Sequence, residues 1–228
     1  MTYEEWMAEF NDTWIKQHLV HKYPLKQYIP RLLHLIWVGK AEQPDTLQKY
    51  LDKWKNLMPH WTVRLWTNED INESEFQPEI LAKINEANTG VQKADIMRYA
   101  IVEKYGGMYV DADMEPVKEL DALLYMSELV VCHDNYVTWE YISIGFFGAK
   151  PNHPVLKKAV ELCITANLNT NTPNFQTGPA LFGVAISLVP PENEKYTLLS
   201  FGTFYGPDCR CEIPEKFGEH HYAKNWDI

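Results

Sequence analysis

Two aspartates, Asp111 and Asp113, stand one residue apart directly after the apolar residues 108–110. In an extended segment residues i and i+2 point the same way, so both carboxylates would leave one face of the chain. Two carboxylates this close repel each other unless a cation lies between them. Hard divalent cations bind carboxylate and diphosphate oxygens alike. The spacing therefore predicts a metal site for a diphosphate ligand, and a solvated acidic turn is the alternative.

A second pair of charges, Asp95 and Arg98, lies in a segment that is apolar on most sides. Thr89 and Gln92 form a capping-box pattern and Gly106-Gly107 can end a helix, so we expect a helix between them. Charges in such a helix are rarely unpaired. Two interpretations follow: the residues pair with each other three positions apart, or Asp95 accepts from a ribose hydroxyl while Arg98 faces a phosphate or sugar.

Aromatic and histidine side chains offer further ligand contacts. Trp37 ends an apolar run, where an indole can stack on a nucleobase or belong to the core. In the tail, one of His220 and His221 could complete the coordination shell that the aspartates leave open. A rival interpretation joins both histidines to Cys209 and Cys211 as a zinc site, and an exposed polar terminus is the third.

The elements that must position these residues alternate between strand and helix patterns. Hydrophobic patterning predicts a helix at 45–57, another at 89–105, and a third after His153-Pro154, while 180–189 is compatible with helix or strand. The alternation favours an α/β fold with a largely parallel sheet, whose ligands bind at the carboxyl ends of strands. Trp37 and the two aspartates stand at two such ends. The strands are expected at 31–39, 61–67, 108–113, 128–134 and 142–149.

Composition limits the classes of partner. The 228 residues, 46% of them hydrophobic, can bury the core of one domain. A net charge of −10 argues against attraction to nucleic acid or to an anionic membrane. No segment has the roughly 18–20 apolar residues of a membrane span, and the first residues do not read as a signal peptide. We expect a cytoplasmic protein with reduced cysteines, an N-terminal helical appendage (1–28) and a lid-like tail (202–228).

These elements, in this order, resemble the sugar-transferase family with an Asp-x-Asp motif, glycosyltransferase family 32. That family includes fungal mannosyltransferases and bacterial capsule transferases, and the clostridial glucosylating toxins are distantly similar. The resemblance implies one GT-A domain over residues 1–228, with a mostly parallel central sheet flanked by helices. It also implies retaining transfer of a hexose from a UDP- or GDP-sugar to a glycan or glycolipid hydroxyl, with Mn²⁺, or Mg²⁺ in its place. The matching stretches are 29–40, 93–115, 148–156, 177–182 and 220–226.

The resemblance also implies roles for single residues at the metal. Asp111 and Asp113 match the metal motif, with Asp113 as the direct ligand, and His221 matches the last protein ligand. Arg98 and the metal would neutralise the diphosphate as it departs. The sequence shows no convincing carboxylate nucleophile, which favours a front-face reaction in which the leaving phosphate helps to deprotonate the acceptor.

The resemblance also implies which residues bind the donor, and some of them are the metal-site residues named above. Trp37 matches the aromatic residue that stacks on the base, Asp95 the ribose contact, and Arg98 the contact to sugar or phosphate. Asp111 belongs to this set too, and Trp226 matches a tryptophan that closes near the diphosphate.

The chain also departs from the family. Residues 142–146 read Ile-Ser-Ile-Gly-Phe where an asparagine is often found, and Asn225 stands where serine is common. Two other classes stay open. Phosphatases of the haloacid-dehalogenase type also have Asp-x-Asp after an apolar strand, but they place Thr or Val where this chain has Glu115. A non-catalytic sugar-nucleotide-binding module would keep the same site without turnover.

Overall fold

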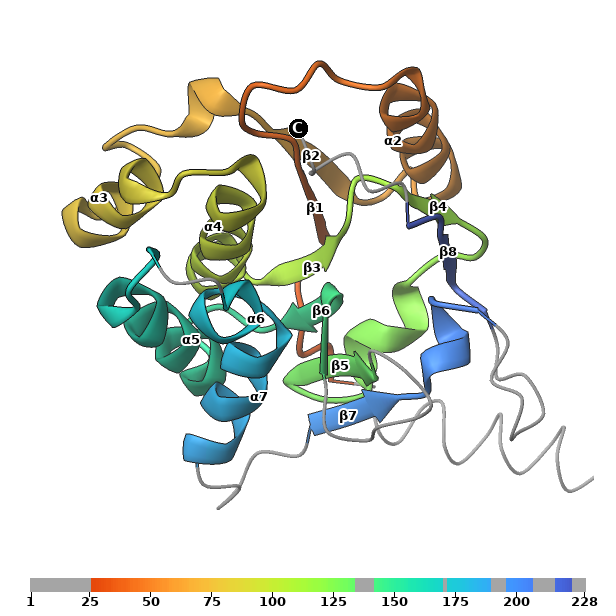
Figure 1. The fold of residues 1–228 in the computed structure, drawn as a ribbon. Helices are drawn as coiled ribbons and strands as arrows, with labels where there is room; N and C mark the ends of the chain where they lie inside the picture. Colours follow the sequence, from red (N-terminus) through yellow and green to blue (C-terminus); the bar gives the residue numbers. More distant parts are fainter. Residues whose placement is uncertain (1–25, 134–141, 170–171, 190–195, 207–215, 223–228) are drawn as a thin grey trace, which may run out of the picture.

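The structure, a computed structural model, describes residues 26–133, 142–169, 172–189, 196–206 and 216–222. Within them, six strands form one sheet in the order β2-β1-β3-β6-β5-β7, and β4 pairs with β8 in a second, two-stranded sheet (Figure 1). The strands are β1 (Leu32–Ile36), β2 (Thr62–Trp66), β3 (Gly107–Val110), β4 (Met114–Pro116), β5 (Leu129–His133), β6 (Ile142–Ala149), β7 (Tyr196–Leu199) and β8 (Gly218–His220).

The main sheet is mixed rather than wholly parallel. Strand β1 is parallel to β2 and to β3, and β5 is parallel to β7, whereas β6 runs antiparallel to both of its neighbours. The connection 134–141 between β5 and β6 is shorter than the dozen or so residues that a parallel crossover needs, so β6 returns antiparallel. The predicted α/β fold is confirmed, with this one reversal in the sheet.

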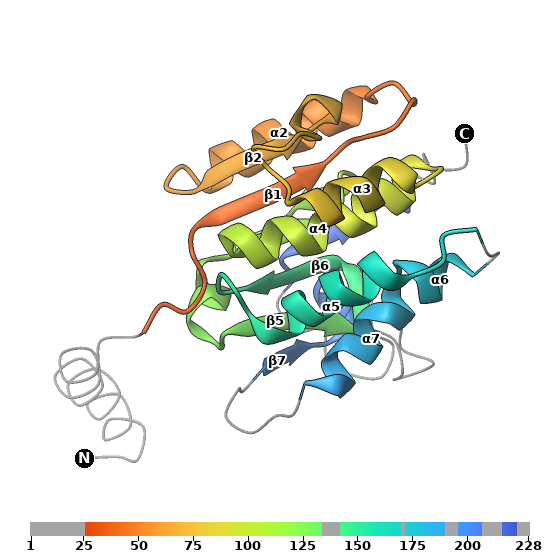
Figure 2. The same cartoon turned by 90° about the vertical axis from the view of Figure 1, so that its left-hand side faces the viewer.

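Helices cover both faces of the sheet, as Figure 1 shows, and Figure 2 looks onto the face that carries most of them. One face packs against α3 (Pro78–Glu86), α4 (Gly90–Tyr105), α5 (Pro154–Thr165) and α7 (Pro179–Leu188), with the short α6 (Pro173–Gln176) beside α7. The other face packs against α2 (Asp45–Leu57), the 3-10 turn η3 (Asp121–Tyr125) and Phe204, which follows the turn η4 (Phe201–Thr203). Successive residues of a strand point to opposite faces of the sheet and so belong to different hydrophobic cores. In β3, Tyr109 packs in the core beneath α4 and α5, whereas Met108 and Val110 pack in the core beneath α2. The segment 180–189, for which the sequence allowed helix or strand, is helical as far as Leu188.

Helix α4 forms as its local sequence predicts. Thr89 is its N-cap and accepts a hydrogen bond from the Gln92 N–H, 3.2 Å away. The helix ends at Gly106 (φ 65°), and Gly107 (φ 99°) also has a positive φ. A Cβ at Gly106 would lie 2.6 Å from Pro151, so side-chain bulk is excluded as well. The chain then reverses into β3, which delivers Asp111 to the carboxyl end of the sheet.

The described part of the predicted lid-like tail is anchored to the rest of the domain. Strand β8 pairs antiparallel with β4, and Phe204 and Phe217 are buried in the core behind it. The lid over 202–228 stays a prediction, since residues 207–215 and 223–228 lie outside the described residues, as does most of the predicted N-terminal helical appendage. Among the described helices, none is long and apolar enough to cross a bilayer.

Candidate metal and donor site

The two aspartates lie in a turn between β3 and β4. The Met114 N–H donates to the Asp111 carbonyl at 3.0 Å and closes this turn, so the pair is not in the extended segment that the sequence predicted. The carboxylates nonetheless converge, and strand β8 brings His220 to the same place, because its register sets His220 opposite Met114. Ligand atoms of Asp111, Asp113 and His220 all lie within 4.8 Å of one another.

His220 is the histidine that faces the aspartates. Its Nε2 lies 3.1 Å from Asp113 Oδ1 and 3.5 Å from Asp111 Oδ2, while its buried Nδ1 has no hydrogen-bond partner among the described residues. Tyr222 meets the imidazole edge-on, with 4.3 Å between the ring centroids. Burial opposes protonation of His220, but the hydrogen bonds and charges of both aspartates outweigh it and raise its pKa to about 9. The protonated imidazole thus places a positive charge beside the two aspartates, where a metal cation would otherwise balance them.

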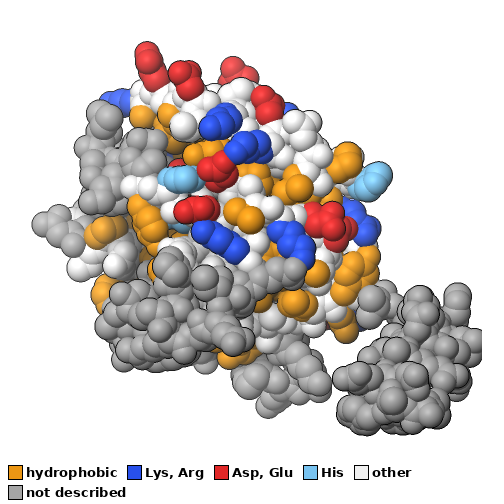
Figure 3. Space-filling model, turned by 90° about the vertical axis from the view of Figure 1, so that its right-hand side faces the viewer, with side chains coloured by type: hydrophobic (Ala, Val, Ile, Leu, Met, Phe, Trp, Pro, Cys, Tyr) orange, Lys and Arg blue, Asp and Glu red, His pale blue; other side chains and the backbone are white. Residues whose placement is uncertain are grey.

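His221, the predicted metal ligand, lies apart from this cluster. Its Nε2 is 2.9 Å from Glu115 Oε2, and its ring stacks on Tyr50 with the centroids 5.5 Å apart. Lys53 forms an ion pair with the other Glu115 oxygen. Neighbouring residues at a strand end point to opposite sides, so the pairing of β8 with β4 separates the two histidines. Figure 3 shows this side of the molecule, where acidic, basic and histidine side chains lie close together.

Asp95 and Arg98 form the ion pair that was one of their two predicted interpretations. Arg98 Nη2 lies 2.9 Å from Asp95 Oδ1, and both residues are buried. Arg98 Nη1 also donates to the Ile144 carbonyl at 2.8 Å and to Asp111 Oδ1 at 3.2 Å. Burial raises the pKa of Asp95 to about 6, against the charge of Arg98 and a hydrogen bond from Thr177. The donor contacts expected of this pair stay a prediction.

Asp111 is held from several sides. Tyr109 donates its hydroxyl to Asp111 Oδ1 at 2.8 Å, alongside Arg98. Burial alone would raise the pKa of Asp111, but the charge of Arg98 and the hydrogen bond from His220 outweigh it, and the pKa lies below its ordinary value. The carboxylate is therefore ionised at neutral pH.

Strand β6 passes close to Asp111 where the sequence departs from the family. A Cβ at Gly145 would lie 2.6 Å from Asp111 Oδ2 and 2.8 Å from the Tyr205 hydroxyl, so only glycine leaves room for both. Ser143 donates its hydroxyl to that of Tyr205. Neither Gly145 nor Tyr205 was expected at the site. The signal available in the sequence was a glycine inside a strand, which often marks a close approach of another group.

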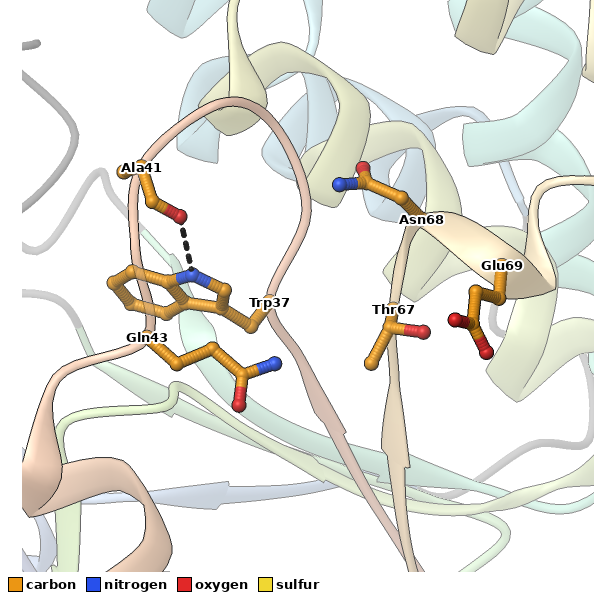
Figure 4. Close-up of a pocket in the computed structure, with 6 residues that line it drawn as sticks. All are labelled: Trp37, Ala41, Gln43, Thr67, Asn68 and Glu69. Carbon is orange, nitrogen blue, oxygen red and sulfur yellow. Dashed lines mark hydrogen bonds between the residues drawn. The ribbon is translucent and has the colours of Figure 1, made fainter.

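Trp37 lies at the end of β1, as predicted, and lines a shallow pocket with Ala41, Gln43, Thr67, Asn68 and Glu69 (Figure 4). Its indole Nε1 donates to the Ala41 carbonyl at 3.0 Å, which fixes the ring. Asn68 holds the loop that follows Trp37. Its side chain accepts from the Gly39 N–H and donates to the Gly39 carbonyl, both at 2.9 Å. The stacking of Trp37 on a base stays a prediction.

The remaining predicted residues lie outside the described ones. These are Trp226 and Asn225 of the tail and the two cysteines Cys209 and Cys211 of the rival zinc site. The described cysteines, Cys132 and Cys163, are both buried.

Comparison with known proteins agrees with the motif. The family model described as "Glycosyltransferase sugar-binding region containing DXD motif" matches residues 44–130, which include Asp111 and Asp113. An uncharacterized glycosyltransferase of Acanthamoeba polyphaga mimivirus is 31% identical over 164 residues, 70% of this chain and 65% of the relative. Inositol phosphoceramide mannosyltransferase 3 of Schizosaccharomyces pombe is 27% identical over 162 residues, 68% of this chain and 44% of the relative. The chain thus spans less than two thirds of the length of these relatives.

Solved structures share the fold. The PaToxG glycosyltransferase superposes with a TM-score of 0.64 at 17% identity, over 83% of this chain and 81% of that one. A glycosyltransferase involved in glycosylation of the major capsid of PBCV-1 superposes with a TM-score of 0.52 at 11% identity, over 85% of this chain and 94% of that one. Motif, sequence and fold agree: residues 44–130 match the glycosyltransferase sugar-binding region that contains a DXD motif, and the chain has the GT-A fold of glycosyltransferases.

Proposed function

We propose that this chain catalyses the metal-dependent transfer of a hexose from a nucleotide-diphosphate sugar to a hydroxyl group of a glycan or glycolipid. The observation that carries the proposal is the convergence of His220 with Asp111 and Asp113, the two aspartates that lie in the segment matched by the DXD family model. In a protein with a net charge of −10, a cation at this place would reverse the local sign for a diphosphate.

The residues present fit a divalent cation. Two carboxylates offer hard oxygen ligands, and His220 aims Nε2 at them from a third side. Mn²⁺ accepts a mixed oxygen and nitrogen shell more readily than Mg²⁺, which prefers oxygen and water. The cation, when bound, would supply charge neutralisation to the diphosphate of the donor. It would also displace the proton of His220, so its binding is expected to weaken as the pH falls.

The other residues take supporting roles in this proposal. Arg98 keeps Asp111 ionised through the contact at 3.2 Å and would add positive charge to the site that receives the diphosphate. The fixed indole of Trp37 offers a face for the base. In this proposal Asp95 contacts the ribose and Trp226 closes near the diphosphate, as the resemblance implies. Retention of the anomeric configuration, by a front-face reaction, is part of the same proposal.

Mannose is the first sugar to test, since curated relatives are named inositol phosphoceramide mannosyltransferases. The experiment is a thermal-shift screen of UDP- and GDP-sugars with Mn²⁺, followed by detection of transfer or slow donor hydrolysis with the donor that stabilises the fold. Proton NMR of the product's anomeric centre reports retention or inversion. Full turnover in excess chelator would contradict the metal requirement.

A matched pair of variants separates the two histidines. His220→Ala is expected to abolish Mn²⁺-dependent donor binding, whereas His221→Ala loses a contact to Glu115 and leaves most of that binding intact. The opposite ranking would assign the metal to His221. Tight donor binding by the wild type, without transfer or hydrolysis, would favour a binding module. A trapped aspartyl-phosphate at Asp111 would favour a phosphatase.

A further inference from the structure

Thr177 lies in the bend between α6 and α7, and it is fully buried. Its N–H donates to the Pro173 carbonyl at 3.1 Å, and its own carbonyl accepts the Tyr99 hydroxyl at 3.0 Å. The next residue is constrained as well, because a Cβ at Gly178 would lie 2.9 Å from the Asn174 Cα. The backbone of Thr177 is thus held at both ends, and its hydroxyl has a defined direction.

That hydroxyl begins a chain of polar contacts that ends at the metal-site carboxylate. Thr177 Oγ1 donates to Asp95 Oδ2 at 2.8 Å, and Asp95 Oδ1 lies 2.9 Å from Arg98 Nη2. Arg98 Nη1 then donates to Asp111 Oδ1 at 3.2 Å. Thr177, Asp95 and Arg98 are 0%, 4% and 6% exposed, so water does not compete for these contacts and each one constrains the next.

The two oxygens of Asp111 have different partners as a result. Oδ1 accepts from Arg98 and from the Tyr109 hydroxyl, whereas Oδ2 faces His220. This division leaves Oδ2 as the oxygen directed at a cation. If the guanidinium moved or turned, Asp111 would lose the contact that sets which oxygen points where.

We infer that Thr177 is a positioning residue for the metal site, which acts through Asp95 and Arg98 to orient Asp111. This inference rests on the proposed function. Groups that hydrogen-bond to metal-ligating side chains typically change metal affinity about 10–100-fold when they are lost. Thr177 acts from further away, so an effect near the lower end of that range is expected.

The test compares Thr177→Val with Thr177→Ser. Valine keeps the branched shape and removes the hydroxyl, and serine keeps the hydroxyl. Binding of Mn²⁺ is followed by loss of the free-ion EPR signal, in the presence of UDP or GDP, whichever the wild type binds. Thr177→Val is expected to raise the Kd for Mn²⁺ about tenfold, and Thr177→Ser to stay within about twofold of wild type.

A second measurement separates positioning from stability. The Tm of each variant is recorded without metal and with Mn²⁺ plus nucleotide, and the metal-dependent increment should shrink in Thr177→Val but not in Thr177→Ser. A Thr177→Val variant that is less stable but binds Mn²⁺ like the wild type would overturn the inference. Equal losses in the valine and serine variants would also overturn it. Should the valine variant not fold, Thr177→Ala is compared with Thr177→Ser on the same terms. A wild type that binds no Mn²⁺ with either nucleotide contradicts the proposed function itself.

Discussion

His34, in the middle of β1, predicts a measurable pH dependence of stability. The ring is 3% exposed and lies between two fixed partners: the Trp66 indole donates to Nδ1 at 3.2 Å, and Nε2 is 2.9 Å from the Gly106 carbonyl. Nδ1 must accept and Nε2 must donate, which selects one neutral tautomer. Burial lowers the pKa of His34 to about 4, despite the opposing hydrogen bond to Gly106.

The lowered pKa of His34 determines whether stability rises or falls with pH. Between pH 6.5 and 4 the unfolded chain binds a proton at this residue and the folded protein does not, so acidification favours unfolding. A shift from 6.5 to about 4 corresponds to about 3 kcal/mol at most. Between pH 7 and pH 5, the free energy of unfolding should fall by about 2 kcal/mol through His34 alone.

The assay is urea unfolding of the wild type and of His34→Gln at pH 7 and pH 5, followed by tryptophan fluorescence. Glutamine can accept from Trp66 and donate to Gly106 but does not titrate. Asp95, whose pKa is raised to about 6, works in the opposite direction, since its protonation on acidification relieves a buried charge. The difference between the two proteins removes this common contribution. Equal losses of stability in both proteins would refute the assignment of His34 as a buried neutral histidine.

Substitutions at three further positions test other parts of the structure. Trp37→Ala should weaken nucleotide affinity by roughly 1–3 kcal/mol in a binding titration while Trp37→Phe recovers much of it; lower stability with unchanged affinity would make Trp37 a core residue. Gly145→Ala should push Asp111 from its place, because the new methyl group would lie 2.6 Å from Oδ2, so Mn²⁺-dependent binding should fall. If calorimetry shows that the Gly145→Ala variant binds Mn²⁺ like the wild type, the prediction is wrong and β6 can shift to accommodate the methyl group. Thr89→Ala removes the N-cap of α4 and should lower the free energy of unfolding by about 1 kcal/mol in urea titrations. No loss would mean that the hydroxyl is replaced there by water.

Much of the frame could be predicted because its signals are local. The cap at Thr89 and the glycines after Tyr105 define α4 within one segment, and apolar periodicity defines α2 at 45–57. The spacing of Asp111 and Asp113, beside a strand end, predicted the candidate metal site, and the resemblance of several stretches to a known family implied the glycosyltransferase class. These features depend on backbone preferences and residue chemistry within a few positions, which the sequence displays directly.

The tertiary structure decided how distant segments meet. Both histidines of the tail were equal candidates by composition, and only the register of β8 on β4 directs His220 to the aspartates and His221 to Glu115. The contact from Thr177 to Asp95 spans 82 positions, and no local pattern announces it. The same holds for Gly145, whose missing side chain matters only because Asp111 approaches it. Such pairings depend on the packing of helices and strands against shared cores, where side chains far apart in sequence compete for the same few ångströms.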